Sequence, residues 1–346
     1  MVFWSTMYHE QGGLHKNVIY VKLRRLLPIW RGAYILEFQH VSVLLEESVQ
    51  ALNVKDKGIY VDGTLGGGGH SYRILSSNPT CRLIGIDRDK DAILAASKRL
   101  EEFSDRVITV NDNFCNVKNV LDKLGIEKID GAVLDLGVSS YQLDNAERGF
   151  SYMHDAPLDM RMNQNDTLSA WEVVNQYAIE DLIRIFYEYG EEKWSKRIAE
   201  FIIEAREKKE IETTLELVDI IKAAIPKKAR LEGGHPAKRI FQAIRIEVNN
   251  ELKILEKSVN DLVDRLSVGG RLAIITFHSL EDRLIKQAFS ALAKGCECPS
   301  SFPVCVCGKK PKVKLVSRKP LLPTKEEEER NSRSKSAKLR VIEKID

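Results

Sequence analysis

Short apolar segments alternate with longer amphipathic ones between residues 40 and 142. The short segments are rich in Val and Ile, as buried strands are, and they cover residues 59–61, 82–86, 107–110 and 129–134. Between them, apolar positions recur every three or four residues, which predicts helices at 43–52, 70–76, 91–103 and 117–124. Strands that alternate with helices form a parallel sheet covered on both faces, so we expect an α/β fold.

The alternation stops after Gly137, and helical patterns follow. Two of them open with the spacing of a capping box, at Ser169-x-x-Glu172 and Thr213-x-x-Glu216. After a basic hinge at 226–235, one apolar stripe runs at helical spacing through Ile240, Phe241, Ile244, Val248, Leu252, Leu255, Val259, Leu262 and Leu266. It predicts a single helix of about thirty residues that ends at Gly269-Gly270, and the sheet resumes at 271–277.

These patterns divide the chain into three parts. Residues 40–142 and 235–346 are predicted to form a discontinuous α/β core, and residues 143–234 a helical insertion. Residues 1–39 differ from both, because five Lys or Arg stand against two acidic residues there, with apolar residues scattered among them. We expect this N-terminal extension to be poorly ordered and to lie outside the core.

An acidic residue follows each of the first four predicted strands, at Asp62, Asp87, Asp112 and Asp135. The carboxyl ends of parallel strands share one edge of the sheet, so these side chains should line a common crevice. The loop at 62–70 also contains five glycines. A glycine-rich turn from a strand into a helix lets backbone amides point at an anionic or zwitterionic ligand. The sequence therefore predicts a small-ligand site at this edge.

Which ligand binds there is not decided by the glycines alone. Their spacing does not fit the dinucleotide fingerprint G-x-G-x-x-G/A, because its last position falls on Ser71 or Tyr72. Asp87 follows about twenty residues later, where an acid accepts the ribose hydroxyls of NAD or of S-adenosylmethionine alike. The generic methyltransferase loop, D-x-G-x-G-x-G, differs as well, since Thr64 stands where its first glycine is expected.

Seven sequence blocks match a narrower pattern. They are Asp62-Gly-Thr-Leu-Gly-Gly-Gly-Gly-His70, Ile86-Asp-Arg-Asp89, Asp135-Leu-Gly-Val-Ser-Ser140, Glu147-Arg-Gly-Phe-Ser151, Pro157-Leu-Asp-Met-Arg-Met162, Phe241-Gln-Ala-Ile-Arg-Ile246 and Phe277-His-Ser-Leu-Glu-Asp-Arg283. Together they resemble the bacterial 16S rRNA cytosine-N4 methyltransferase family (RsmH/MraW), from about residue 40 to the C-terminus. The resemblance implies a Rossmann-like methyltransferase sheet in which the helical insertion recognises the substrate.

The same resemblance implies a cofactor, a target and a set of cofactor contacts. The cofactor is S-adenosyl-L-methionine, and the target is the N4 amine of cytidine 1402 in 16S rRNA of the small ribosomal subunit. The implied cofactor contacts are Gly68, Gly69, His70, Asp87, Phe114, Asp135 and Gln142. Phe114 is also compatible with a purely structural place in the core.

Asp135 is the candidate catalytic residue. Alignment of the nucleophile with the methyl group can supply roughly 7–11 kcal/mol of the rate enhancement. The exocyclic amine of cytosine is a poor nucleophile because the ring withdraws its lone pair, and a proton acceptor typically adds about 10²–10⁴-fold. Whether Asp135 binds the cofactor, accepts the proton or does both is left open. The wider class of N4-amine methyltransferases continues with Pro-Pro and an aromatic, whereas this chain continues as Leu-Gly-Val-Ser-Ser-Tyr.

Other residues have both a functional and a structural interpretation. His278 follows the last predicted strand and is placed to approach the base, whereas Ser279 and Asp282 have the spacing of a capping box. Asp159 and Arg161 lie in an aperiodic segment that core packing explains poorly, which favours a substrate loop.

Contact with RNA must come from local charge, because the chain as a whole carries only +3. The tail at 308–346 has thirteen Lys or Arg and six acidic residues. It is predicted either to neutralise phosphates or only to keep the chain soluble. Four arginines are candidates to line a path for a splayed-out cytidine, and they are Arg148, Arg161, Arg239 and Arg245.

Four of the six cysteines lie close together, at Cys296, Cys298, Cys305 and Cys307. Two C-x-C pairs can complete a tetrahedral thiolate site, but C-x-C is shorter than the usual spacing, and reduced thiols in a surface loop are commoner. We therefore expect chemistry without a metal. So few cysteines fit a reducing compartment, and no apolar run is long enough to span a membrane, so a cytoplasmic location is expected.

Two other functions stay open on the sequence alone. An NAD-dependent oxidoreductase would bind NAD and not S-adenosylhomocysteine, which calorimetric titration with each compound distinguishes. A non-catalytic RNA-binding ribosome assembly factor would use the same fold without transferring a methyl group. The oligomeric state is also open, a dimer included.

Overall fold

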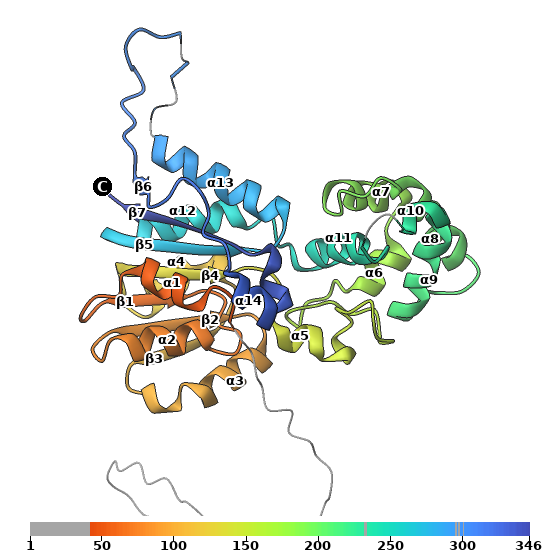
Figure 1. Cartoon of the computed structure of the whole chain (residues 1–346), viewed down its shortest axis with the longest axis horizontal. Coiled ribbons are helices and arrows are strands. Elements are labelled where there is room, and N and C mark those ends of the chain that lie inside the picture. Colours follow the sequence, from red (N-terminus) through yellow and green to blue (C-terminus); the bar gives the residue numbers. More distant parts are fainter. Residues whose placement is uncertain (1–41, 232–233, 295, 297, 300) are drawn as a thin grey trace, which may run out of the picture. The chain divides into compact units, whose positions relative to one another are not determined.

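The protein was analysed as a computed structural model that describes residues 42–346 except 232–233, 295, 297 and 300. The predicted N-terminal extension, 1–39, lies outside the described residues. Seven strands form one sheet in the order β3-β2-β1-β4-β5-β7-β6 (Figure 1). Their bounds are Ile59–Asp62 for β1, Arg82–Asp87 for β2, Val107–Asn111 for β3, Ile129–Asp135 for β4, Leu266–Thr276 for β5, Val313–Leu315 for β6 and Lys338–Lys344 for β7.

The first five strands are parallel, and β7 pairs antiparallel with both β5 and β6. Helices cover both faces, so the α/β fold expected from the sequence is confirmed. On one face lie α1 (Leu45–Leu52), α2 (Gly69–Ser77) and α3 (Lys90–Arg99), and on the other lie α4 (Val117–Lys123), α12 (Leu255–Arg265) and α13 (Ser279–Lys294). Neighbouring residues of β1 serve opposite faces, since Tyr60 belongs to one hydrophobic cluster and Val61 to the other.

A third hydrophobic cluster lies among the helices between β4 and β5. These helices are α5 (Ser140–Asp144), α6 (Ala170–Gln176), α7 (Ile179–Glu188), α8 (Ser195–Arg206), α9 (Thr214–Ala224), α10 (Lys227–Leu231) and α11 (Lys238–Asn249). Both predicted capping boxes are present, at the start of α6 and of α9. None of the helices in the described residues has the length and apolar character needed to cross a bilayer.

The single long helix predicted after the hinge is wrong. It is divided into α11 and α12, because Asn250 adopts the left-handed conformation with φ 53°. The side chain of Asn249 binds a neighbouring loop, donating to the carbonyl of Met160 at 2.7 Å and accepting from the amide of Met162 at 2.8 Å. Glu251 then turns back to form an ion pair with Arg245 at 2.9 Å. The apolar stripe continues across this break, which is why periodicity alone did not reveal it.

The C-terminal tail is more than the solubilising segment considered from the sequence. It supplies β6, β7 and the short helix α14 (Lys325–Arg330). Val341 and Ile342 are buried in β7, and several of the basic residues are held in ion pairs. These pairs join Lys312 to Asp264, Lys314 to Glu343, and both Lys338 and Arg340 to Asp282.

Ile342→Ala and Ile345→Ala test whether β7 is part of the core. Ile342 is fully buried, so its truncation is expected to lower the free energy of unfolding by about 2–5 kcal/mol. Ile345 is 41% exposed just beyond the strand, and its truncation is expected to change that free energy by about 0.5 kcal/mol or less. Urea denaturation of the full chain measures both. Equal effects of the two substitutions would contradict the placement of β7.

Candidate active site

A cavity of about 1120 Å³, part of it open to solvent, lies at the carboxyl edge of the parallel strands. It is lined by the loop after β1 and by residues that follow β2, β3, β4 and β5. Six of the seven residues implied as cofactor contacts line it, and these are Gly69, His70, Asp87, Phe114, Asp135 and Gln142. The seventh, Gly68, precedes α2 directly and has φ 73°. The structure therefore brings the predicted residues together at one edge.

The glycine-rich loop passes too close to its neighbours for side chains. A Cβ on Gly69 would lie 1.9 Å from Oγ of Ser42, and Gly68 has a backbone conformation that L side chains rarely adopt. The amide of Gly66 donates to Oδ2 of Asp87 at 2.8 Å, which fixes the loop against the end of β2. The backbone of this loop thus lines the cavity without side chains in the way.

Thr64 explains why the loop departs from the generic glycine spacing. Its Oγ1 accepts a hydrogen bond from the backbone amide of Asp135 at 2.6 Å, and its own amide donates to Oδ1 of Asp62 at 3.2 Å. Asp62 also accepts from Oγ of Ser71 at 2.7 Å. A glycine at position 64 would lack this hydroxyl. The threonine therefore joins the ends of β1 and β4, a role that the sequence did not reveal.

Asp135 is a half-buried carboxylate with little support from the protein. Oδ1 is buried and has no hydrogen-bond partner among the described residues, and Oδ2 lies 3.9 Å from Nδ1 of His70. Burial, followed by the negative charges of Asp62 and Glu281, raises the pKa of Asp135 well above its ordinary value. A carboxylate with a raised pKa is a stronger proton acceptor than an ordinary one, and it is well suited to bind a hydrogen-bond donor.

The acids beside Asp135 make the cavity favourable for positive charge. Burial raises the pKa of Asp62 to about 6 and also raises the pKa of Asp87. His70 is held in place because its Nε2 lies 3.2 Å from the carbonyl oxygen of Val43. A cationic group in the cavity would stabilise the ionised form of each of these carboxyls.

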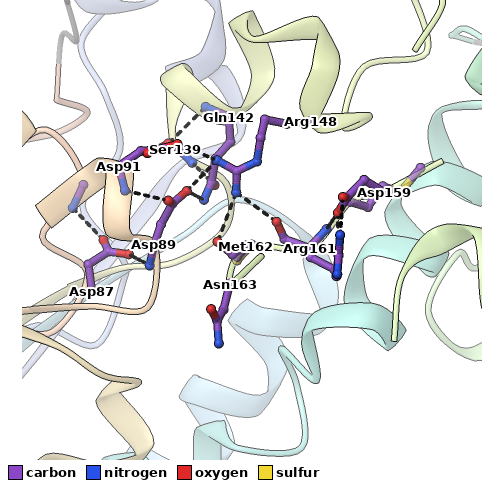
Figure 2. A network of polar contacts seen from close by, with 12 residues as sticks. Asp87, Asp89, Asp91, Ser139, Gln142, Arg148, Asp159, Arg161, Met162 and Asn163 are labelled. Carbon is purple, nitrogen blue, oxygen red and sulfur yellow. Dashed lines mark hydrogen bonds and ion pairs between the residues drawn. The ribbon is translucent and has the colours of Figure 1, made fainter. Parts of the chain in front are cut away.

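Asp89 and Arg148 form a buried ion pair behind the cavity (Figure 2). The side chains are 4% and 3% exposed, and Nη1 of Arg148 donates to Oδ2 of Asp89 at 2.9 Å. The same oxygen accepts from Nε2 of Gln142 at 2.8 Å, and Oδ1 of Asp89 accepts from the amide of Asp91 at the start of α3. The amide of Asp89 donates to Asp87 at 2.9 Å. The ends of β2 and β4 are thereby joined through side chains.

Arg148 also holds the loop at 157–162. Its Nη2 donates to the carbonyl oxygens of Arg161 and Met162, at 2.9 and 3.0 Å (Figure 2). Asn249 binds the other side of this loop, as described above for Met160 and Met162. Met162 lines the cavity, so the loop has a fixed position at its border.

The candidate substrate residues Asp159 and Arg161 pair with each other. Nη2 of Arg161 lies 2.7 Å from Oδ2 of Asp159, and the pair is partly buried. Arg148 and Arg245 were expected to line a path for RNA, but both are held in ion pairs inside the protein, so this expectation is wrong. Arg239 is 54% exposed and keeps its place as a candidate RNA contact.

The first turn of α13 differs from the predicted capping box. Oγ of Ser279 donates to Glu191 at 2.8 Å, and Asp282 pairs with basic residues of β7, so these two residues do not cap the helix together. Glu281 takes that role and accepts from the amide of Phe277 at 2.8 Å. Nε2 of His278 lies 3.1 Å from Oε1 of Glu281, which turns the imidazole toward the helix start. His278 is not among the described residues that line the cavity.

Some residues at the cavity were not singled out from the sequence. Glu251, Glu281 and Arg333 line it. Glu251 reaches it because of the break after α11, Glu281 because it caps α13, and Arg333 because the tail is folded. Conversely, Asp112 borders a neighbouring depression together with Asn163 and Asp166, and it is not among the described residues that line the cavity. The acid after β3 is therefore not part of the common crevice predicted for all four strand ends.

The sequence matches one family profile and several named relatives. A profile of the MraW methylase family matches residues 37–345. A protein of Clostridium botulinum named "Ribosomal RNA small subunit methyltransferase H" is 60% identical over 311 residues, which cover 90% of this chain and 100% of the relative. Proteins of the same name from Lachnospira eligens and Finegoldia magna are 57% and 56% identical, over 90% of this chain and 99% and 100% of theirs.

Thr64→Val and Thr64→Ser test the hydroxyl that joins β1 to β4. Valine keeps the shape of threonine but leaves the amide of Asp135 without its acceptor, so the free energy of unfolding should fall by about 1–3 kcal/mol. Serine keeps the hydroxyl and should cost less than valine. Urea denaturation of the full chain compares them. A valine variant as stable as the serine variant would contradict the assigned role.

Proposed function

The chain belongs to the MraW methylase family, and from that premise we propose that it transfers a methyl group from S-adenosylmethionine to the N4 amine of cytidine 1402 in 16S rRNA. The name shared by the relatives supports small-subunit rRNA as the substrate. Resemblance to the cytosine-N4 family supports the finer assignment of base and position. Family membership also favours methyl transfer over the hydride transfer of the oxidoreductase alternative.

The observation that carries the proposal is the half-buried carboxylate of Asp135, whose Oδ1 has no partner among the described residues and which lines a cavity bordered by the glycine-rich loop. Bound S-adenosylmethionine supplies the methyl group and brings a positive charge on sulfur. The cavity fits such a ligand, because Oδ1 of Asp135 has no hydrogen-bond partner among the described residues and backbone alone forms the wall at the glycines. We assign cofactor contacts to Gly68, Gly69, His70, Asp87, Phe114, Asp135 and Gln142.

The assigned cofactor contacts differ in which of their atoms are left to bind the cofactor. Asp87 already accepts two backbone amides and has further lone pairs for ribose hydroxyls. Phe114 offers an apolar face suited to adenine. Both polar atoms of the Gln142 side chain bind protein, because Oε1 accepts from Ser139 and Nε2 donates to Asp89. Gln142 therefore acts mainly by positioning the segment after β4.

Asp135 is assigned as the proton acceptor. The N4 lone pair of cytosine becomes available when an N–H proton moves toward a carboxylate, and the raised pKa of Asp135 favours this transfer. As the carbon–nitrogen bond forms and the carbon–sulfur bond breaks, N4 gives up that proton to Asp135. Solvent then takes the proton through the open side of the cavity.

The helical insertion, 143–234, is proposed to recognise the RNA, while the core, 40–142 and 235–346, carries the cofactor. Support comes from the loop at 157–162, which is held at the cavity border by Arg148 and Asn249 and places Met162 in its wall. A cytidine must leave its stack to reach such a recessed carboxylate. The loop is positioned to accept an extruded base.

Asp135→Asn tests the catalytic assignment. The amide has nearly the same shape but cannot accept the proton, so single-turnover methylation should slow by about 10²–10⁴-fold. Calorimetric titration with S-adenosylhomocysteine separates this loss from weaker cofactor binding. Asp112→Asn is the matched control, because this strand-end acid does not line the cavity and its substitution should leave the rate unchanged. Unchanged methyl incorporation in the Asp135 variant would refute the assignment.

The pH profile gives a second readout of the same substitution. Asp135 must be ionised to accept a proton, so the rate should fall as pH falls through its raised pKa, above the range of ordinary aspartates. The Asn variant should lack this acidic limb. A profile with the same limb in both proteins would assign the titration to another group.

The position of the methyl group can be tested in cells. Mass spectrometry of 16S rRNA fragments from cells with and without the gene should show one methyl missing from one cytidine. Expression of the wild-type chain should restore it, and expression of the Asp135→Asn variant should not. Loss of a methyl from another nucleotide would contradict the proposed target while leaving rRNA methylation in place.

A further inference from the structure

Four cysteines converge in the connection between α13 and β6. They are the two C-x-C pairs at Cys296, Cys298, Cys305 and Cys307, and their sulfur atoms all lie within 4.8 Å of one another. The residues of this connection extend away from the sheet (Figure 1). The cluster is therefore remote in the fold from the residues that line the cavity.

The sulfur separations match the edges of a thiolate tetrahedron. Cys305 Sγ lies 3.5 Å from Cys296, 3.9 Å from Cys298 and 3.6 Å from Cys307, and Cys307 lies 3.8 Å from Cys296. Zinc–sulfur bonds of about 2.3 Å in a regular tetrahedron give sulfur separations of about 3.8 Å. The measured values are far longer than a disulfide bond of about 2.05 Å. No disulfide bond joins the cysteines of the described residues.

Apolar packing does not account for the convergence. The large apolar residues of this connection are mostly in solvent, since Phe302, Val304 and Val306 are 50%, 70% and 72% exposed. The amide of Val306 instead points at Sγ of Cys298, at 3.3 Å. Backbone amides directed at sulfur stabilise the negative charge of thiolates that bind a metal. Lys294 and Lys310 flank the cluster in the sequence and add positive charge.

We propose that Cys296, Cys298, Cys305 and Cys307 bind one zinc ion that holds the connection between α13 and β6 in place. All four positions around the metal are filled by protein, as in structural zinc sites, so none is left for a substrate. Binding replaces the thiol protons with metal–sulfur bonds and releases those protons to solvent, without oxidation or reduction. The ion would hold this connection together, as buried apolar side chains hold together other parts of the chain.

A second group of potential ligands in the described residues lacks these features. Glu251, His278 and Glu281 also lie within reach of one another. Arg245, however, already occupies both carboxylate oxygens of Glu251, at 2.9 Å each. The protein thus neutralises that group with its own arginine.

Metal analysis of the full chain tests the proposal. The protein is purified under reducing conditions without chelators, and inductively coupled plasma mass spectrometry should find about one zinc per chain. Cys298→Ser and Cys305→Ser should each lose most of it. Cys115→Ser is the matched control, because this half-buried thiol lies outside the cluster and its loss should leave the zinc content unchanged. Equal zinc in all three variants would overturn the proposal.

Cobalt substitution gives a readout that needs no variant. After removal of the native metal, Co²⁺ added to the wild-type chain should produce the intense visible bands of a tetrahedral tetrathiolate, and zinc should abolish them. Absence of the bands, a native content of iron, or an intact mass showing the thiols joined as disulfides would each overturn the zinc assignment. None of these measurements depends on methylation, so the two proposals stand or fall separately.

Discussion

The ion pair between Asp89 and Arg148 is the contact on which the arrangement of the site depends. Both side chains are removed from water, and removing one partner of such a pair typically costs about 3–5 kcal/mol because the other is left charged and buried. Through Asp89 the pair reaches Asp87 and the start of α3, and through Arg148 it reaches the loop at 157–162. A single buried charge pair thus sets the distance between the end of β2 and the loop at 157–162.

Burying acidic side chains at the cavity destabilises their ionised forms. Asp62, Asp87 and Asp135 all have raised pKa values, which means that burial disfavours their ionised forms in the protein alone. A cationic ligand recovers part of that cost when it binds, and a neutral thioether product recovers less. The acids that favour binding of the cationic methyl donor therefore also favour release of the neutral thioether product.

The sequence was sufficient for the parts of the fold that depend on local pattern. The first four strands and the helices between them follow from short apolar runs and helical periodicity, and the strand-end residues Asp87 and Asp135 do line one cavity. The errors concern contacts between distant residues. Asn250 belongs to a residue type that readily ends a helix in the left-handed conformation, but the apolar stripe continues across it and hid the break. Nothing near Arg148 indicates a partner at Asp89. Strand β7 was not predicted because its polar positions are the basic residues Lys338 and Arg340, which pair with Asp282 of α13. In a basic tail, these residues hide the alternation of apolar and polar positions that indicates a strand.

The place of β7 in the sheet has a consequence for biosynthesis. It separates β6 from β5 and is formed by residues 338–344, so β5 lacks its second neighbour until that segment has been synthesised. Until then the nascent chain presents an unpaired edge of a largely apolar strand, the kind of surface that chaperones recognise and that aggregates. A message cut short before residue 338 would leave this edge open permanently, and the resulting polypeptide would be a natural target for degradation.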